Sequence, residues 1–458
     1  MIQSLYRHVL IPAYESGWHR RGTFRHLRSM ERSQWLSTDE QASRQLESLR
    51  QILTHATATC PYYAGAWQAQ GLDARAVLSL ADYQRWPLID RDTIRANRLQ
   101  MRSTRKDLRT FAKATGGSSG VPLQFEVDFG SNDRKMAAWH RGYGWAGAGL
   151  GTKQFYLWGT ATGNPPWLKR CKDELYQRLY RRKVVSCFGM RDDRVEWYLQ
   201  QLNEYRPEAI VAYTNPLYFL ARALEERGLR PWQPESIVVG AEKLHTFQRD
   251  VIERVFQAPV FETYGSREFM LIGAECSEHA GLHVTTENML VEVLDDEGHI
   301  TPSGEEGNVV ITDLTNYGMP FIRYLNGDRA VAGFKSCKCG RGLPLLGQIV
   351  GRRLDTLRTP DGRLVPGEFF PHFLKDFVAV RRFQVVQHAL DHVELKLVRG
   401  QAWAGDERQS MTQEIQSLLG EAVKLEITEV DEIPLTAAGK LRVVVSHCAD
   451  EKQPAGTR

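Results

Sequence analysis

The feature that most constrains the fold is an alternation of short apolar runs with helix-like segments between about residues 184 and 262. Four runs of five residues have the composition of buried strands, and they are Val184–Phe188, Ala209–Tyr213, Ser236–Gly240 and Pro259–Thr263. Between the runs, Asn215 and Pro216 mark the N-cap and first turn of one helix, and His245–Gln257 forms another. The alternation predicts βαβ units around a parallel sheet, so the fold class is α/β.

The pattern changes after Gly351. Four further elements follow, namely Val380–Gln387 and Asp391–Val398 as a hairpin, Glu407–Leu419 as a helix and Val423–Val430 as a strand. They form a small α+β unit of about 100 residues, which is a usual domain size. Because a chain of 458 residues exceeds one ordinary core, we predict a large N-terminal domain over 1–350 and a small, mobile C-terminal domain over 351–458.

Charge and composition exclude several classes of protein. The net charge of +4 is the balance of 59 basic and 55 acidic residues without long single-sign runs, so no nucleic-acid partner is expected. Residues 6–28 mix basic with aromatic and aliphatic side chains; we interpret them as the basic face of a packed segment, with a membrane-surface helix as the alternative. The sequence has neither an apolar run of about 18 residues nor a secretory signal, which predicts a cytoplasmic protein without a transmembrane segment. A homodimer is compatible with this composition.

A glycine- and hydroxyl-rich segment has the composition of a phosphate-binding loop. Its residues are Thr115, Gly116, Gly117, Ser118, Ser119 and Gly120. Glycine permits positive φ, so successive backbone N–H groups can turn toward one anion, and the hydroxyls add donors. The segment is not a Walker loop, because Val121-Pro122 closes it where a helix would have to open. A plain solvent loop can have the same composition, so the prediction depends on the motifs that follow.

Five motifs follow this loop in the sequence: Val239–Lys243, Thr263–Glu268, Ile322–Asp328, Gly351–Arg352 and Thr436–Lys440. In this order and spacing they resemble the signature of the adenylate-forming superfamily, which comprises acyl-CoA synthetases, nonribosomal adenylation domains and luciferases. The resemblance covers roughly residues 110–445. The short chain, Tyr-Gly-x-x-Glu, Arg-Tyr-x-x-x-Asp and a cysteine pair look most like the phenylacetate-CoA ligase family, including its branch found with capsular polysaccharide biosynthesis.

The resemblance implies a role for each nucleotide-site residue. Tyr264 resembles the aromatic residue that stacks on adenine, and Glu268 resembles the carboxylate that holds Mg²⁺ against the phosphates of ATP. Asp328 resembles the carboxylate that accepts hydrogen bonds from both ribose hydroxyls. The further ATP-binding residues implied are Gly240, Ala241, Glu242, Gly265 and Arg352. The alternatives are a surface glutamate for Glu268 and a structural ion pair for Asp328 or Arg352.

Lys440 resembles the lysine that bridges the attacking carboxylate and the α-phosphate, where it neutralises charge that develops in the transition state. It is distant in sequence from the phosphate loop, so it reaches the nucleotide only when the small domain closes, and closure is thereby coupled to chemistry. A solvated loop lysine is the alternative. The sequence departs from the family pattern at Gly120-Val121-Pro122, which lacks the usual loop lysine. Pyrophosphate is then held by N–H groups, hydroxyls and Mg²⁺.

Seven cysteines, an odd number without a secretory signal, do not indicate a disulfide framework. Cys337 and Cys339 form a tight chelating turn, and Cys276 lies upstream with His283. Three thiolates and one imidazole make a closed structural Zn²⁺ site. His283 is preferred to His279 because Gly-Leu-His resembles metal-bearing members of the family. Free buried cysteines are the alternative.

The expected reaction is attack of a carboxylate on the α-phosphate of Mg·ATP, which gives an acyl-adenylate and pyrophosphate. The resemblance makes coenzyme A the default acceptor and an aryl or arylacetic acid the default donor. The acid pocket is expected around Tyr213, Gly240, Ala241 and Glu262. The alternatives are an amide or ester ligase of a polysaccharide or natural-product pathway and a noncatalytic zinc-containing binding protein.

Overall fold

The chain forms two compact units, an N-terminal unit of residues 1–350 and a C-terminal unit of residues 351–458. The computed structural model describes residues 2–115, 123–159, 167–187, 190, 192–334, 336–352, 357–361, 364–365, 369–374, 377, 379–400, 402–403, 406–434 and 442–448. Among these residues, no helix has the length and apolar composition that a bilayer span requires.

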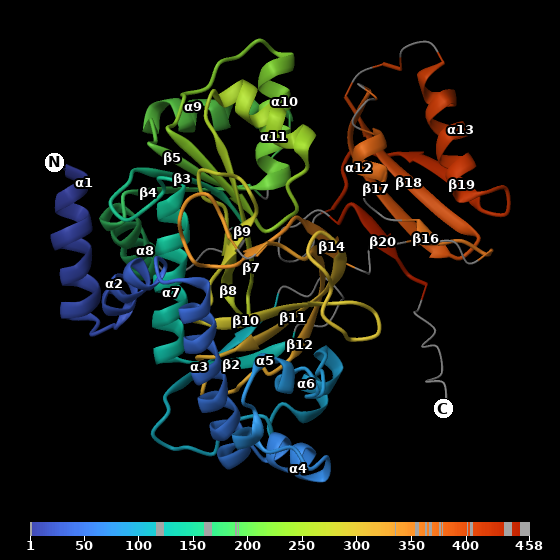
Figure 1. The fold of residues 1–458 in the computed structure, drawn as a ribbon. Coiled ribbons are helices and arrows are strands. Elements are labelled where there is room, and N and C mark those ends of the chain that lie inside the picture. Colours follow the sequence, from blue (N-terminus) through green and yellow to red (C-terminus); the bar gives the residue numbers. More distant parts are fainter. Residues whose placement is uncertain are drawn as a thin grey trace. The chain divides into compact units, whose positions relative to one another are not determined.

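Helices and short helical turns fill most of the first hundred residues of the N-terminal unit (Figure 1). They are α1 (Ile2–Leu5), η1 (Tyr6–Leu10), η2 (Ala13–Trp18), α2 (Thr23–Ser33), α3 (Thr38–Thr59), α4 (Pro61–Ala69), η3 (Ala74–Ala76), α5 (Leu80–Tyr83) and α6 (Arg91–Asn97). The long helix α3 begins at a capping box: the Ser37 side chain accepts from the backbone N–H of Glu40, whose carboxylate accepts from the N–H of Ser37.

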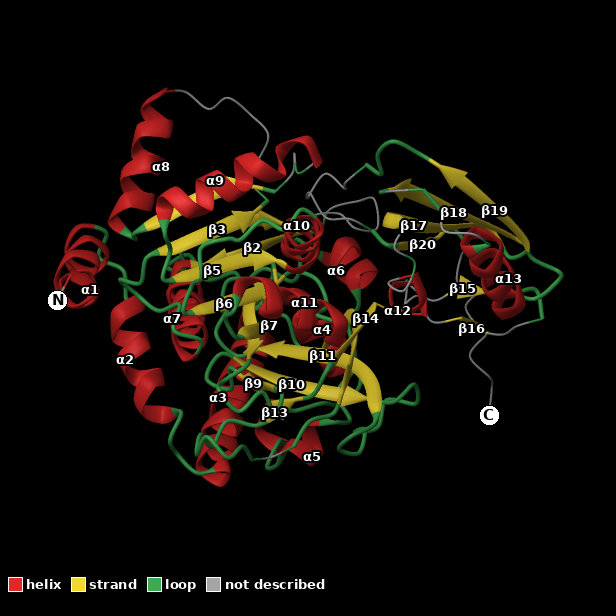
Figure 2. Cartoon of the chain, turned by 90° about the horizontal axis from the view of Figure 1, so that it is seen from above, coloured by secondary structure: helices red, strands yellow, loops and turns green. Residues whose placement is uncertain are grey.

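The central sheet of this unit has the strand order β13-β9-β8-β7-β6-β5-β3-β4 (Figures 1 and 2). Its parallel part consists of β3 (Gln154–Trp158), β4 (Arg182–Ser186), β5 (Ala209–Tyr213), β6 (Ser236–Gly240) and β7 (Val260–Ser266). The antiparallel part consists of β8 (Met270–Ala274), β9 (Leu282–Val284) and β13 (Leu345–Leu346). The parallel sheet predicted from the apolar runs is confirmed.

Helices connect the parallel strands. They are α8 (Trp167–Leu179), η4 (Asp192–Arg194), α9 (Val195–Tyr205), α10 (Thr214–Glu226) and α11 (Thr246–Phe256). The prediction of Asn215 as an N-cap is wrong, because α10 already begins at Thr214 with Tyr213 as its N-cap. The backbone N–H of Asn215 instead donates to the carboxylate of Glu242, 2.9 Å away.

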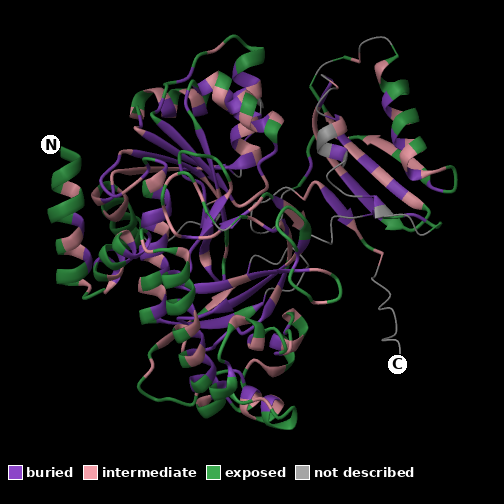
Figure 3. Cartoon of the chain, in the orientation of Figure 1, coloured by how far each residue is buried: buried purple, intermediate pink, exposed green. Residues whose placement is uncertain are grey.

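Both faces of the parallel sheet are buried, which explains the nearly continuous apolar runs. In β5, Ile210 and Ala212 belong to a hydrophobic cluster with residues of α9, α10 and α11. Ala209 and Val211 belong to another cluster with Tyr143 of α7 (Phe129–Trp145). Every residue of β5 and β6 is buried, and Figure 3 shows buried strands at the centre of this sheet.

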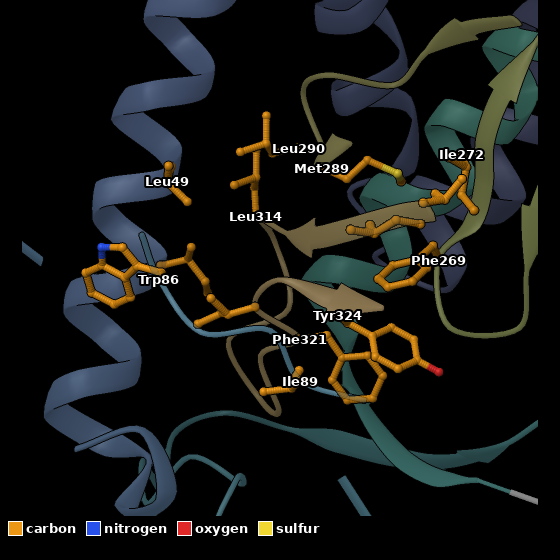
Figure 4. Close-up of a cluster of buried hydrophobic side chains, with 14 of the residues drawn as sticks. Leu49, Trp86, Ile89, Phe269, Ile272, Met289, Leu290, Leu314, Phe321 and Tyr324 are labelled. Atoms are coloured by element: carbon orange, nitrogen blue, oxygen red, sulfur yellow. The ribbon is translucent and has the colours of Figure 1, made fainter. Parts of the chain in front are cut away.

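A second, four-stranded sheet has the order β10-β11-β12-β14. Its strands are β10 (Met289–Leu294), β11 (Glu306–Asp313), β12 (Tyr324–Val331) and β14 (Ile349–Arg352), and β1 (Thr110–Ala114) pairs with β2 (Gln124–Asp128) in a separate hairpin. The largest hydrophobic cluster joins this sheet to α3 and α4. Figure 4 shows Phe269, Phe321 and Tyr324 together in it, with ring centroids 5.2 to 6.2 Å apart.

The C-terminal unit contains a sheet of order β19-β18-β17-β20. Its elements are β15 (Leu357–Arg358), β16 (Leu364–Val365), α12 (Phe369–Leu374), β17 (Val380–Ala389), β18 (His392–Arg399), α13 (Glu407–Leu419), β19 (Lys424–Glu429) and β20 (Val444–Ser446). Apolar residues of α13, including Met411 and Ile415, pack with Val385, Val393 and Leu395 of the sheet. The predicted hairpin, helix and following strand are confirmed.

Candidate active site

Some predicted site residues lie outside the described residues, and they are Gly116, Gly117, Ser118, Ser119, Gly120 and Lys440. Arg352 is described as the last residue of β14, without its side chain. The remaining predicted residues all have described side chains or backbone, and they fall into a nucleotide group and a cysteine–histidine group.

Tyr264 and Asp328, predicted to face adenine and ribose, are brought together from two sheets. The Tyr264 hydroxyl donates to Asp328 Oδ2 at 2.7 Å. Asn326 Nδ2 donates to the Tyr264 hydroxyl at 2.7 Å and to Asp328 Oδ2 at 3.1 Å, while the Asp328 N–H donates to Asn326 Oδ1 at 3.0 Å. The Asp328 carboxylate is therefore oriented by two side chains. Asn326 was missed from the sequence because Asn-Gly-Asp has the composition of an ordinary turn.

Glu268 is buried, with 5% of its side chain exposed, so it is not a surface glutamate. No hydrogen bond joins its carboxylate to any described residue, which is unusual for a buried charge. Burial and the nearby Glu268 carboxylate raise the pKa of Tyr324, so this carboxylate lies near the Tyr324 phenol. A buried carboxylate of this kind fits a hard cation such as Mg²⁺.

Contacts of Glu268 and of its neighbours in the chain fix the backbone at this residue. Its carbonyl oxygen accepts from Lys135 Nζ at 2.9 Å, and the same ammonium pairs with Asp313 at 2.7 Å. Both partners of this ion pair are at most 3% exposed. The next residue, Phe269, is part of the hydrophobic cluster described above. At Gly265, a Cβ atom would lie 2.0 Å from the Met270 carbonyl oxygen, so this turn requires glycine.

The turn after β6 contains Gly240, Ala241 and Glu242. A Cβ atom on Gly240 would lie 2.5 Å from Thr263 Oγ1, and Ala241 has a φ of 69°, so the backbone is tightly constrained. The Glu242 carboxylate accepts a hydrogen bond from the N–H of Asn215 in the first turn of α10, where a negative charge interacts favourably with the helix dipole. Glu242 thus has a structural contact, and its contact with nucleotide stays a prediction.

The predicted acid pocket lies where parallel strands end, the edge at which α/β proteins bind ligands. The rings of Tyr213 at the end of β5 and Trp158 at the end of β3 are 4.4 Å apart. Glu262 is buried in β7, and its carboxylate accepts from the N–H of Leu244 at 3.3 Å. Burial, followed by the neighbouring Glu275 carboxylate, raises the pKa of Glu262 to about 7.

The four preferred metal ligands lie together. One ligand atom from each of Cys276, His283, Cys337 and Cys339 lies within 4.8 Å of every other. Cys276 Sγ is 3.8 Å from Cys337 Sγ, and Cys339 Sγ is 3.2 Å from His283 Nε2. Two thiolates on one Zn²⁺ at about 2.3 Å in tetrahedral geometry are roughly 3.8 Å apart, so the spacing fits this ion.

His283 has a fixed ring orientation. Its Nδ1 lies 3.1 Å from the Leu343 carbonyl oxygen, which leaves Nε2 facing the thiols. Burial, together with Arg341 and Arg141, lowers the pKa of His283 to about 4, so the imidazole is neutral at neutral pH, as a ligand must be. His279, the alternative ligand, lies outside the group and contacts Glu275 at 3.2 Å instead.

The fold is that of adenylate-forming enzymes. The structure is similar to 2-hydroxyisobutyryl-CoA ligase solved with an acyl-adenylate in the postadenylation state, with a TM-score of 0.70, 20% identity and 91% coverage of each chain. The same ligase with 2-HIB-AMP gives a TM-score of 0.69 at 20% identity and the same coverage. These likenesses establish the fold.

Sequence comparison finds relatives that cover most of the chain. A phenylacetate-coenzyme A ligase of Thermus thermophilus is 26% identical over 434 residues, covering 88% of this chain and 95% of that protein. Protein CapK of Staphylococcus aureus is 24% identical over 382 residues, covering 81% of each. Residues 357–447 match the CapK C-terminal domain. The chain is thus similar to phenylacetate-CoA ligases and to CapK, the groups that its motifs resemble.

Proposed function

We propose that this protein activates a carboxylic acid with ATP, releases pyrophosphate, and transfers the acyl group from the adenylate to coenzyme A. The observation that carries the proposal is the buried Glu268 carboxylate, which has no protein hydrogen-bond partner among the described residues. The oriented Asp328 supports it. So do the relatives, which include phenylacetate-coenzyme A ligases of Thermus thermophilus and Pseudomonas putida.

Each of these residues has its own role in the adenylation step. Asp328 accepts hydrogen bonds from the ribose, and Tyr264 both orients Asp328 and faces the base. Glu268 would hold Mg²⁺, which neutralises charge on the phosphates when bound. Lys440 neutralises the charge that develops as the acid attacks the α-phosphate. The acid lies at the strand ends near Tyr213, whose aromatic neighbour Trp158 favours a substrate with an apolar or aromatic group.

Acid-dependent exchange of pyrophosphate into ATP tests the adenylation step. A library of aryl, arylacetic and hydroxy acids should contain at least one that supports exchange. Lys440→Ala should abolish this exchange, whereas Lys338→Ala, a lysine exposed in the cysteine turn, serves as the matched control. Lack of exchange with every acid would contradict the proposal and favour the noncatalytic alternative.

The acceptor requires a second measurement. With the acid identified by exchange, mass spectrometry should detect a thioester only when coenzyme A is present. The amide or ester ligase is the alternative acceptor chemistry that the sequence left open. Exchange that proceeds without any thioester product would support this alternative.

We also propose that Cys276, His283, Cys337 and Cys339 bind a structural Zn²⁺. The ion would fasten the segment that follows β12 to β9 of the central sheet, because Cys337 and Cys339 lie beyond β12 and His283 lies in β9. Elemental analysis should find about one zinc per chain, reduced in Cys339→Ser and unchanged in Cys171→Ser, an exposed cysteine outside the group. Equal zinc contents in both variants would contradict the assignment.

A further inference from the structure

The hairpin of β1 and β2 ends at the predicted phosphate loop, and its end is closed by two hydrogen bonds. The N–H of Thr115 donates to the Leu123 carbonyl at 3.0 Å, and the N–H of Leu123 donates to Thr115 Oγ1 at 2.9 Å. Because side chains alternate along a strand, Phe111 and Lys113 share one face of β1, and Thr115 follows directly after the strand. The Lys113 ammonium lies 5.5 Å from the centre of the Phe111 ring on that face.

Lys113 is half-buried and has no anionic partner in the part of the chain that the structure describes. No carboxylate among the described residues forms an ion pair with it, and the charges that act on it come from Lys135 and Arg267, both positive. Burial, followed by these two cations, lowers the pKa of Lys113 to about 8. An unpaired, partly desolvated ammonium near like charges is unfavourable. The arrangement is therefore incomplete without an anion.

Arg267 reaches the same place from another element. It precedes Glu268 in the turn between β7 and β8, and its Nε donates to the carbonyl oxygen of Ala114, next to Thr115, at 3.3 Å. No carboxylate among the described residues pairs with its guanidinium. Arg267 thus brings a second uncompensated cation to the end of β1, beside the carboxylate assigned to Mg²⁺.

Lys135 differs from these two residues, although it is close enough to act on Lys113. Its ammonium is neutralised by Asp313 at 2.7 Å and also donates to the Glu268 carbonyl oxygen. Its contacts are complete within the protein. The uncompensated positive charge in this region consequently belongs to Lys113 and Arg267.

We propose that Lys113 and Arg267 bind the β- and γ-phosphates of ATP, and so the departing pyrophosphate, in place of the lysine that Gly120-Val121-Pro122 lacks. This inference rests on the proposed adenylation function. A guanidinium matches two phosphate oxygens at once, and an ammonium adds a compact charge. Negative charge accumulates on the pyrophosphate as its bond to the α-phosphorus breaks, so both cations stabilise the leaving group.

Binding of Mg·pyrophosphate, measured by calorimetry without acid or coenzyme A, tests the inference. Lys113→Met and Arg267→Met keep an unbranched apolar side chain and remove the charge. Each should weaken pyrophosphate binding by about 10- to 100-fold, the range for a charge-assisted hydrogen bond. Lys106→Met, an exposed lysine on the same segment, is the matched control and should change binding less than about twofold.

AMP binding separates this role from a general structural one. AMP lacks the β- and γ-phosphates, so its affinity should stay within about twofold of the wild type in both variants. Lys113→Arg retains the charge and should recover most of the pyrophosphate affinity, which also guards against a variant that fails to fold. Unchanged pyrophosphate binding in Lys113→Met and Arg267→Met would overturn this inference but not the proposed function. A wild-type protein that binds neither ATP nor pyrophosphate would overturn the proposed function with it.

Discussion

Replacing Glu262 with glutamine should stabilise the protein, and only at high pH. The carboxyl group is buried in β7, near the Glu275 carboxylate, and it accepts a hydrogen bond from the N–H of Leu244 at 3.3 Å. Burial and Glu275 raise its pKa from the ordinary 4.5 to about 7. Glutamine has nearly the same shape and keeps an oxygen that accepts from Leu244, but it carries no charge.

The sign and size of the effect follow from the two pKa values. Below the unfolded-state pKa of about 4.5, Glu262 is protonated in both states and imposes no penalty. Between this value and the folded-state pKa of about 7, the unfolded protein is ionised while the folded protein keeps its proton, so stability falls as the pH rises, and the loss is complete above about pH 7. A shift of about 2.5 units corresponds to about 3 kcal/mol at 1.36 kcal/mol per unit. Glu262→Gln should therefore be about 3 kcal/mol more stable than the wild type at pH 8, and within about 1 kcal/mol of it at pH 5.

Urea unfolding of both proteins at pH 5 and pH 8, followed by tryptophan fluorescence, measures this difference from the midpoints and slopes. Glu305→Gln, an exposed glutamate, is the control and should change stability by less than about 0.5 kcal/mol at either pH. The reasoning is refuted if Glu262→Gln differs from the wild type equally at both pH values, or is less stable at pH 8.

Three further substitutions test the surroundings of the site. Arg323→Met removes a buried ion pair with Glu292 at 3.1 Å and should destabilise the fold by about 3 to 5 kcal/mol in thermal or urea unfolding. Lys135→Met leaves Asp313 buried without its partner; we expect a loss of similar size, and a smaller loss in Lys135→Met/Asp313→Leu. Gly265→Ala should impair Mg·ATP binding by calorimetry, since the added methyl meets a backbone carbonyl and displaces the turn before Glu268.

Much of the architecture follows from local pattern. Apolar runs such as Ala209–Tyr213 predict buried parallel strands because helices cover both faces of the sheet, and the observed β5 has those same bounds. Val380–Gln387 and Asp391–Val398 have the pattern of two strands, and they predict the observed hairpin of β17 and β18. The sequence predicts the ends of helices and strands less well. For example, β7 extends to Ser266 because its pairing with β8 continues beyond the apolar run.

The site was only partly predictable. Tyr264 and Asp328 are recognisable by motif, but the hydrogen bond between them joins two sheets and leaves no trace in sequence spacing. Lys113 was missed because one basic residue in a basic stretch carries no local signal; its significance comes from burial and from the absence of a carboxylate partner among the described residues. The sequence preferred His283 to His279 only by resemblance, and the structure places His283, in β9, within the cysteine group and His279 outside it.

The hydrogen bonds on Asp328 have a consequence for nucleotide selectivity. A site discriminates strongly against an analogue that lacks a hydroxyl when the missing hydroxyl leaves a buried polar group of the site without a hydrogen-bond partner. Asp328 already accepts hydrogen bonds from Tyr264 and Asn326 before any nucleotide binds. Its carboxylate therefore keeps these two hydrogen bonds when the nucleotide lacks one ribose hydroxyl. The same contacts that hold Asp328 ready for ATP should therefore make this protein tolerant of 2′-deoxy-ATP.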